Sequence, residues 1–481
     1  MVDATAQAVT APNLSDAVGQ MSLNHPLHQD SLNLRQPAQS LPFDILSRIF
    51  IECNAQNEDG FPKLSTRKAP SVLGHICSHW RDVASATHTL WAELHIFLGY
   101  RTTHNYLKAA VAAWENRAGQ LPLSFHISAT SYPDSPDART IAVVDAIMPH
   151  RERWKHVGGT LPFEQWSAIC SAISNGAPLL EHLNISGYFG RGKFIDIQLS
   201  TAPMLETLVV NANHRLLRLD SHSQSLRRLS VYGAEQIECL SYLLWSSKLE
   251  EFELKCGAHN RHINWDKGIV ETTRLVSLKL DARFTPHILD RLRSPLLQIL
   301  DLDCGHTGTS LESFLIRSKP SLKSLRVNVD IDPGDLFNCL RYAPTLRALR
   351  IAYNPELTGL DVERLKLGSN VNENICPALE KMEFDCCIVG DMEYLEEVVL
   401  SRWKGPPVVA ALPSSTSGTE YALDGSWERS LRHVTLDGCY FEVYTKGLVC
   451  YFTDRPKIRK CIKEGLVIFE ELPSDSDDSV F

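Results

Sequence analysis

The chain has 481 residues, 44% of them apolar and 22% charged, which is typical of a water-soluble protein with enough apolar surface for more than one packed region. Its net charge of −9 argues against nucleic acid as a partner, because nucleic-acid binding needs a basic footprint. No apolar run is long enough for a membrane span and no signal-peptide pattern begins the chain, so we expect no membrane partner. The thirteen cysteines lack paired spacing, which favours reduced thiols in an intracellular protein of the cytoplasm or nucleus.

Two short helices are predicted after residues 1–38, whose composition predicts disorder. In the stretch 41–50, Pro42 suits the first helical position and Asp44 adds negative charge to the first turn. Apolar residues then recur at helical spacing and predict one continuous face: Leu46, Ile49, Phe50 and Cys53. A similar stripe follows at Leu73, Ile76, Cys77, Trp80 and Ala84. Two such helices cannot bury much surface alone, so we expect the face of the first helix to be left for a partner.

These residues resemble the F-box, in the version that is common in mushroom-forming fungi. The resemblance covers residues 41–97 and rests on three elements in order: Leu41-Pro42-x-Asp44-Ile45-Leu46-x-x-Ile49-Phe50, Ile76-Cys77-x-x-Trp80-Arg81-Asp82-Val83-Ala84 and Leu90-Trp91. Asp44 stands where glutamate is commoner, and the loop 54–70 is longer than in a minimal F-box. We therefore expect an F-box-like helical domain over residues 39–97.

The resemblance implies a partner, a Skp1-like adaptor that links the chain to a cullin in an SCF-type ubiquitin ligase. Ubiquitin transfer is then carried out by other subunits, so the chain is expected to be a non-catalytic receptor. The implied docking surface, with the residues packed behind or beside it, is Leu41, Pro42, Ile45, Leu46, Ile49, Phe50, Leu73, Ile76, Trp80, Leu90 and Trp91. The alternative is that these helices only begin a globular domain.

Strand and helix signals continue immediately after this region. The run 93–98 is compatible with a strand, and a helical stripe follows at Tyr106, Leu107, Ala110, Val111 and Trp114, with Gly119 at the expected stop. The stretch 121–127 alternates like a half-buried strand, and 131–139 is predicted to be a loop.

From there a unit of the form Leu-x-x-Leu-x-Leu recurs, with starts 21 to 26 residues apart between Leu180 and Leu346. The first apolar residues of the predicted units are Leu180, Leu205, Leu226, Leu249, Leu275, Leu297, Leu322, Leu346, Leu379 and Leu431, and Trp154 with Val157 is a degenerate earlier member. The alternating residues predict short parallel strands, each with an apolar side that only its neighbours can cover. The usual asparagine after the strand is mostly absent, so the repeats are irregular.

The predicted fold is therefore an α+β or α/β solenoid: a short N-terminal helical F-box-like unit, then an irregular leucine-rich-repeat solenoid with a parallel sheet over residues 98–452. Two longer gaps between units predict loop insertions at about 353–375 and 402–427. Residues 453–481 form a C-terminal segment that ends in an acidic tail, expected to be disordered from Glu470 and to be either solubilising or phosphorylated on its serines.

The sequence offers no catalytic, cofactor or metal site. His75, Cys77 and His79 cannot converge on one ion, because alternate positions of a helix point about 200° apart. Cys386 and Cys387 follow a repeat strand, so we expect one to point inward and the other outward. No phosphate-binding loop, nucleophile elbow or zinc-protease motif is present, and a cysteine-based enzyme is the weakest hypothesis.

The outward positions of the repeat strands form a mixed-charge inner face suited to a protein target. Arginine and tyrosine are enriched at binding hot spots, so the predicted target-binding residues are Arg228, Tyr232, Arg326 and Arg350. The main hypothesis is a substrate-recognition subunit of a ubiquitin ligase with an unidentified protein target. The alternative is a leucine-rich-repeat interaction scaffold that is not assembled into a ligase.

Overall fold

The computed structural model describes residues 41–55, 60–99, 103–129, 137–187, 195–197, 199–212, 217–219, 225–234, 236–256, 268–281, 286–303, 308–328, 331–353, 357–387, 391–404, 430–439, 441 and 451–471. The predicted disorder of residues 1–38 lies outside these ranges, as do most of the predicted insertion at 402–427 and the tail beyond residue 471.

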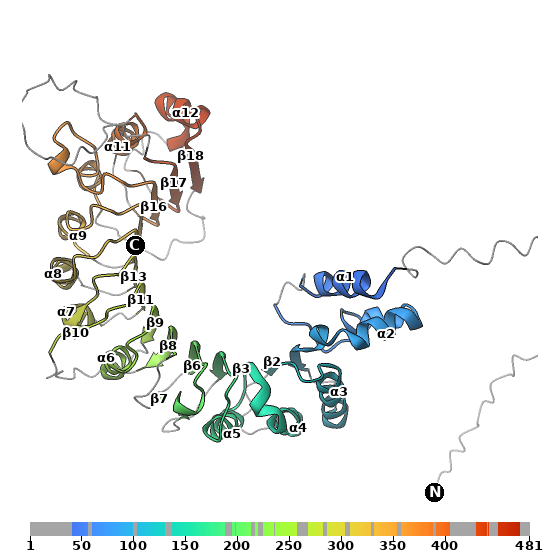
Figure 1. Ribbon diagram of the computed structural model, residues 1–481. Helices are drawn as coiled ribbons and strands as arrows, with labels where there is room; N and C mark the ends of the chain where they lie inside the picture. Colours follow the sequence, from blue (N-terminus) through green and yellow to red (C-terminus); the bar gives the residue numbers. More distant parts are fainter. Residues whose placement is uncertain are drawn as a thin grey trace, which may run out of the picture.

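A single sheet of fourteen parallel strands runs through nearly the whole described chain and curves into an arc (Figure 1). Consecutive strands are neighbours throughout, apart from four short strands that belong to two small sheets. The fourteen are β1 (Glu93–Leu98), β2 (Leu123–Ala129), β3 (Trp154–Thr160), β4 (His182–Gly187), β6 (Thr207–Ala212), β8 (Arg228–Ala234), β9 (Glu251–Cys256), β11 (Ser277–Asp281), β13 (Ile299–Asp303), β14 (Ser324–Asn328), β15 (Ala348–Ala352), β16 (Lys381–Asp385), β17 (His433–Asp437) and β18 (Val467–Glu471). The small sheets pair β5 (Ile195–Ile197) with β7 (Leu217–Leu219), and β10 (Val270–Glu271) with β12 (Leu292–Arg293).

Helices cover the outer, convex face of the arc, and the strands line its inner, concave face (Figure 1). These helices are α3 (His104–Arg117), α4 (Ala138–Ile147), α5 (Phe163–Ser174), α6 (Gln236–Trp245), α7 (Pro286–Arg291), α8 (Gly308–Ser318), α9 (Pro333–Leu340), α10 (Gly359–Glu363), α11 (Met392–Lys404) and α12 (Pro456–Lys463). Short 3-10 helices complete the connections: η4 (Met148–Arg153), η5 (Leu199–Thr201), η6 (Val371–Glu373) and η7 (Phe452–Asp454).

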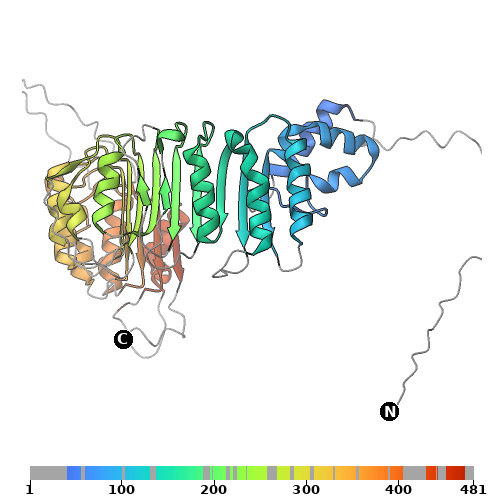
Figure 2. The ribbon, with the colours of Figure 1, turned by 90° about the horizontal axis from the view of Figure 1, so that it is seen from below.

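A separate group of helices lies at the N-terminal end of the arc, which Figure 2 shows from below. It contains α1 (Phe43–Ala55), η2 (Ser71–His75), α2 (Ser78–Ala86) and η3 (His88–Trp91). We call residues 41–91 the N-terminal helical unit.

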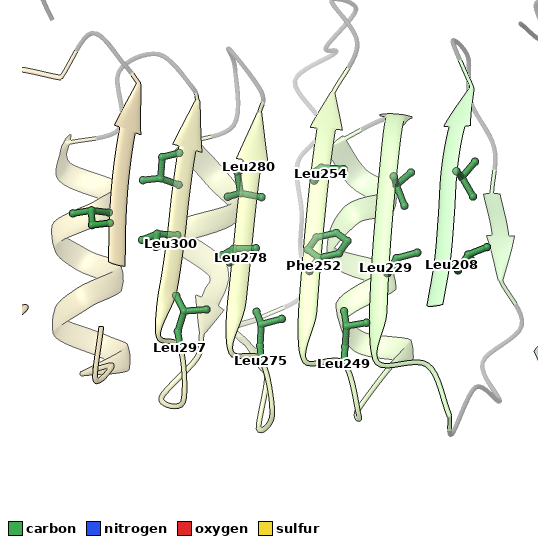
Figure 3. Packing of buried hydrophobic residues seen from close by; sticks show 14 of the residues in the cluster. Leu208, Leu229, Leu249, Phe252, Leu254, Leu275, Leu278, Leu280, Leu297 and Leu300 are labelled. Carbon is green, nitrogen blue, oxygen red and sulfur yellow. The ribbon is translucent and has the colours of Figure 1, made fainter. Parts of the chain in front are cut away.

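The leucine pattern explains the sheet. Every apolar position of the ten predicted units is buried, and each predicted unit forms one strand of the sheet. The first leucine ends a turn, as where the Leu180 N–H donates to the Ala177 carbonyl at 3.2 Å, and the two alternating residues then point to the helices (Figure 3). Equivalent residues pair across strands, so that Leu229, Phe252 and Leu278 form one buried row. The prediction of a solenoid-like α/β fold with a parallel sheet is confirmed, and the degenerate unit at Trp154 is β3.

The sheet extends beyond both ends of the predicted solenoid, which covered residues 98–452. It begins with β1, inside the segment assigned to the F-box-like domain, because Glu93–Leu98 pairs in register with β2. It ends with β18, which includes Glu470 and Glu471 and so corrects the expectation that the chain is disordered from Glu470. The Glu470 carboxylate accepts hydrogen bonds from the N–H groups of Phe452 and Thr453, which fixes it in place.

Two predicted loops contain helix. Residues 353–375 include α10, whose N-terminus is closed by a capping box between Thr358 and Asp361. The end of the predicted 131–139 loop belongs to α4, because the Asp137 side chain accepts hydrogen bonds from the first N–H groups of that helix. In the described ranges, no helix has the length and apolar character needed to span a membrane.

Candidate protein-interaction surfaces

The N-terminal helical unit is held together by a small apolar core under α1. Leu46 and Phe50 are fully buried, and the Phe50 ring lies 5.0 Å from the Trp80 ring of α2. Hydrogen bonds tie the same helices together. Thr87 donates to the Ser47 hydroxyl at 2.9 Å, and the Trp91 indole donates to the Ala84 carbonyl at 2.7 Å. Helix α1 therefore has a fixed orientation within the unit.

Trp91 also joins this unit to the solenoid. Its ring lies edge-on to the Trp114 ring of α3 at 4.8 Å, and the guanidinium of Arg117 stacks over it at 4.7 Å. His88 hydrogen-bonds the Arg117 carbonyl through Nδ1 at 2.6 Å. The end of η3 thus packs on the first convex helix of the arc.

The structure divides the predicted docking residues into two groups. Inside the unit lie Leu46, Phe50, Leu73, Leu90 and Trp91, with Leu41 and Trp80 partly buried. On its surface lie Pro42, Ile45, Ile49 and Ile76. The prediction that Leu46, Ile49, Phe50 and Cys53 share one continuous face left for a partner is wrong. Helix α1 turns Leu46 and Phe50 toward α2 and leaves Ile49 and Cys53 in solvent.

The exposed side of α1 is nevertheless apolar. Phe43, Ile45, Ile49 and Ile51 retain between 40% and 49% of their accessible surface. They flank the buried stripe on both sides of the helix. Phe43 and Ile51 were not predicted as surface residues; the signal was the near-continuous apolar composition of α1.

The second predicted helical stripe is interrupted. Helix α2 begins only at Ser78, and Cys77 caps it by accepting a hydrogen bond from the Trp80 N–H. Cys77 is therefore a capping residue, and His79 hydrogen-bonds the Leu41 carbonyl through Nε2 at 3.2 Å. Across the described ranges, no group of three histidine, cysteine, aspartate or glutamate side chains is arranged to hold a metal ion.

The predicted target-binding residues all lie on strands of the concave face, each beside a carboxylate. Arg228 lies 3.6 Å from Glu251, and Arg326 lies 3.6 Å from Asp301. The Tyr232 hydroxyl donates to Glu253 at 2.9 Å; burial and this carboxylate raise the pKa of Tyr232 to about 12. The four residues do not form one cluster, because Arg228 and Tyr232 lie on β8 whereas Arg326 and Arg350 lie side by side on β14 and β15.

The register explains the two arginine pairs, because Arg228 lies opposite Glu251 and Arg326 lies opposite Asp301. Along the middle row of the concave face, Glu253, Lys279, Asp301, Arg326, Arg350 and Glu383 follow one another on successive strands. Neighbouring strands in a sheet lie about 4.8 Å apart, so opposite charges in one row reach each other. The result is a charge ladder whose signs alternate except at Arg326 and Arg350, which are neighbours.

The N-terminal end of the concave face is different, and the sequence reasoning missed it. Four strands in succession place a histidine there: His95 on β1, His126 on β2, His156 on β3 and His182 on β4. Phe61, from the connection between α1 and η2, covers part of this group. The available signal was the position of each histidine beside inward-pointing apolar residues of a strand, as in Leu94-His95-Ile96.

Cys386 and Cys387 follow β16. Cys387 is buried and donates to the Ile351 carbonyl, whereas Cys386 is exposed, so the predicted division is confirmed. Burial raises the pKa values of the Cys339 and Cys376 thiols to about 12, which makes both poor nucleophiles.

The fold and its surfaces define a solenoid-like α/β protein with a helical unit at one end. No family model matches the chain, and no curated protein matches it. Among solved structures, it is similar to a crystal structure of a Bacteroides fragilis protein, with 13% identity over 78% of this chain and 74% of the other and a TM-score of 0.24. A likeness of this degree carries no argument about function.

Proposed function

We propose that this chain is the substrate-recognition subunit of an SCF-type (Skp1-cullin-F-box) ubiquitin ligase. The N-terminal helical unit would be an F-box that docks on a Skp1-like adaptor, and the leucine-rich solenoid would bind a protein target on its concave face. The chain would act by proximity, holding the target near the conjugating subunits without a catalytic residue of its own. Such a role belongs in the cytoplasm or the nucleus.

One observation carries this proposal: α1 is fixed by Leu46 and Phe50 and exposes four large apolar side chains beside them. Two of them, Ile45 and Ile49, are one helical turn apart on the same side of α1, and neighbouring exposed apolar side chains of this kind are typical of interaction sites. Covering them would contribute about 25 cal/mol for each Å² of apolar surface removed from water. The sequence resemblance to the F-box supplies the identity of the partner.

The four proposed target contacts set a condition on binding. A target group that reaches Arg326 or Arg350 must compete with the carboxylates already beside them, so it has to bring a carboxylate or an equivalent acceptor of its own. Arg228 and Tyr232 face the same condition on β8 and β9.

The test is copurification of the full chain with a Skp1-type adaptor. Ile45→Ser with Ile49→Ser removes two exposed apolar contacts from α1 and leaves its buried stripe intact, so we expect at least about a tenfold loss of bound adaptor. The matched control is Leu244→Ser with Ile316→Ser, because both of these side chains are 45% exposed and lie on convex helices α6 and α8. Equal adaptor binding by the two double variants would refute the proposal.

A second candidate function is an interaction scaffold that is not assembled into a ligase. The packing of Trp91 on Trp114 favours it, because a helical unit that caps the solenoid would serve the fold without any adaptor. One measurement, the recovery of a cullin together with the chain, distinguishes the two functions. A scaffold would retain its target while failing to bring down a cullin, even when the adaptor is present in excess.

A further inference from the structure

The segment Gly60–Leu64, which we call the strap, runs along the first strand of the sheet. The His95 N–H donates to the Pro62 carbonyl at 2.7 Å, and the Leu64 N–H donates to the His95 carbonyl at 3.1 Å. Lys63 pairs with His95 in the parallel direction. The strap therefore extends the sheet by one bridge and covers the edge of β1 that would otherwise offer open hydrogen-bonding groups.

A single aromatic residue of the strap reaches over the concave face. The Phe61 ring stacks on the His126 ring at 6.2 Å and meets the His156 ring edge-on at 5.0 Å. The contacts continue along the sheet, because His95 lies 4.9 Å from His126 and His156 lies 5.6 Å from His182. Phe61 thus bridges two imidazole pairs, His95 with His126 and His156 with His182, which together we call the imidazole row.

The position of the His156 ring depends on a glycine. A side chain at Gly158 would place its Cβ 3.0 Å from the His156 Nε2 atom. Within the described ranges, this Nε2 atom is buried and has no hydrogen-bond partner. An imidazole without a partner at a buried nitrogen is stable only when it is neutral, because a buried charge needs a compensating group.

The charges of the described residues around the row do not supply that compensation. Among those residues, the titratable and charged groups that face the row are His95, His182, Lys63 of the strap and Glu93, which is two strands from His156 in the register. Burial lowers the pKa of His126, and burial together with the neighbouring His182 and His126 lowers the pKa of His156 to about 4. Protonation would place like charges next to one another under Phe61.

We propose that the strap is an acid-sensitive clasp: Phe61 fastens it to the neutral imidazoles of His126 and His156, and their protonation releases it from β1. The strap lies between α1 and η2 in the chain, so its release would detach from β1 the segment of the N-terminal helical unit that pairs with that strand. This inference does not depend on whether the chain belongs to a ligase.

The direction follows from the linkage of protons to opening. The closed clasp favours neutral imidazoles, so its stability is full above the ordinary histidine value of about 6.5 and falls as the pH decreases toward about 4. At about pH 5, His156 alone should raise the opening constant on the order of tenfold relative to about pH 7.5. The opening is expected to be local and not to spread into the middle of the sheet.

The experiment is hydrogen–deuterium exchange on the full chain at about pH 7.5 and about pH 5, with rates corrected for intrinsic exchange so that protection is compared. The reporters are the amides of His95 and Leu64, and the reference is the Ile299 amide, which donates to Val276 in the middle of the sheet. At about pH 5 we expect the protection of the His95 and Leu64 amides to be about tenfold lower than at about pH 7.5, whereas the protection of the Ile299 amide should not change. Parallel loss at all three amides would mean global unfolding and would overturn the proposal.

Variants distinguish the contribution of Phe61 to amide protection from that of other aromatic side chains near β1. Phe61→Ala should remove protection from His95 and Leu64 already at about pH 7.5, whereas Phe97→Ala, an exposed aromatic on the same strand, should not. His126→Asn with His156→Asn should make the protection insensitive to pH. If that double variant loses protection at both pH values, the comparison of Phe61→Ala with Phe97→Ala tests the proposal instead. Equal protection of the His95 and Leu64 amides in these two variants would refute the clasp.

Discussion

Arg350 on β15 donates a hydrogen bond from Nε to the Oδ2 atom of Asp385 on β16, at 2.6 Å. Only 6% of the Asp385 surface remains accessible, so this carboxylate depends on its partner. The same guanidinium also lies 4.0 Å from Glu383. A residue that the sequence pattern assigns to target binding therefore also has a structural task inside the concave face.

Replacing Arg350 by alanine should destabilise the fold. The substitution leaves the buried Asp385 carboxylate without its charged donor, and we expect a cost of about 1–3 kcal/mol in the free energy of unfolding. The measurement is the urea midpoint of the full chain. Arg228→Ala is the matched control, because Arg228 and Glu251 are both largely exposed and such pairs contribute little. A similar midpoint for both variants would contradict the structural task of Arg350.

The Arg402 side chain is expected to be indispensable. It is fully buried, and its guanidinium donates to the carbonyls of Leu365, Ile375 and Cys376. Burial lowers the pKa of Arg402 to about 10, so it stays charged at neutral pH. Arg402→Met leaves three carbonyls unsatisfied and should cost at least about 3 kcal/mol.

Lysine at position 402 should not rescue the fold, because a lysine has one ammonium and not a planar fork of donors. Thermal unfolding and limited proteolysis of the segment that follows α10 test both substitutions. Wild-type protease resistance of either variant would show that the three carbonyls find other donors.

Glu115 should make stability depend on pH near neutrality. Burial raises the pKa of its carboxyl to about 7, and its Oε2 atom lies 3.2 Å from the His150 Nε2 atom. Burial also lowers the pKa of His150, so we interpret the contact as a hydrogen bond between neutral groups. The protonated carboxyl contributes fully below about pH 4.5, and its contribution is lost as the pH rises through about 7.

The variant Glu115→Gln should therefore be more stable than the wild type at about pH 8 and little different at about pH 5. Melting temperatures across that interval provide the measurement. Glu152→Gln, at an exposed position in η4, should leave the profile unchanged. An unaltered pH profile for Glu115→Gln would contradict the assignment.

Gly159 should tolerate no side chain. Its φ of +135° is unfavourable for other residues, and an added Cβ would lie 1.9 Å from the Ile127 carbonyl oxygen on the neighbouring strand. Gly176 has a φ of +110° with open space around it, so Gly176→Ala measures the backbone strain alone, on the order of 1–2 kcal/mol. Gly159→Ala should lower the urea midpoint by clearly more than Gly176→Ala, because the strands β2 and β3 must separate.

Much of the fold was predictable because each repeat contains, within a few residues, the spacing that specifies its strand. A leucine such as Leu278 lies two residues from Leu280, and this spacing specifies a strand with one buried side. The last strand was missed because Val467 and Phe469 lack the leucine pattern and precede an acidic tail. Helix α10 was missed because its five residues carry no periodic stripe.

The interaction surfaces were less predictable. On α1, Ile45 and Leu46 are neighbours in sequence, and only the position of α2 decides which of them is buried. The imidazole row depends on pairings between strands that are about thirty residues apart in sequence, which no short motif records. Local periodicity predicts which residues alternate, whereas register decides which of them meet.

The two ends of the sheet are finished differently. At β1 the strap supplies hydrogen bonds and the helical unit adds apolar packing, whereas Val467 and Phe469 of β18 are exposed on the concave side. In an array where each unit depends on its neighbours, the less supported terminus melts first. On heating, the strands of the sheet should therefore separate in order, beginning with β18. The N-terminal surface would be the last part of the array to be lost.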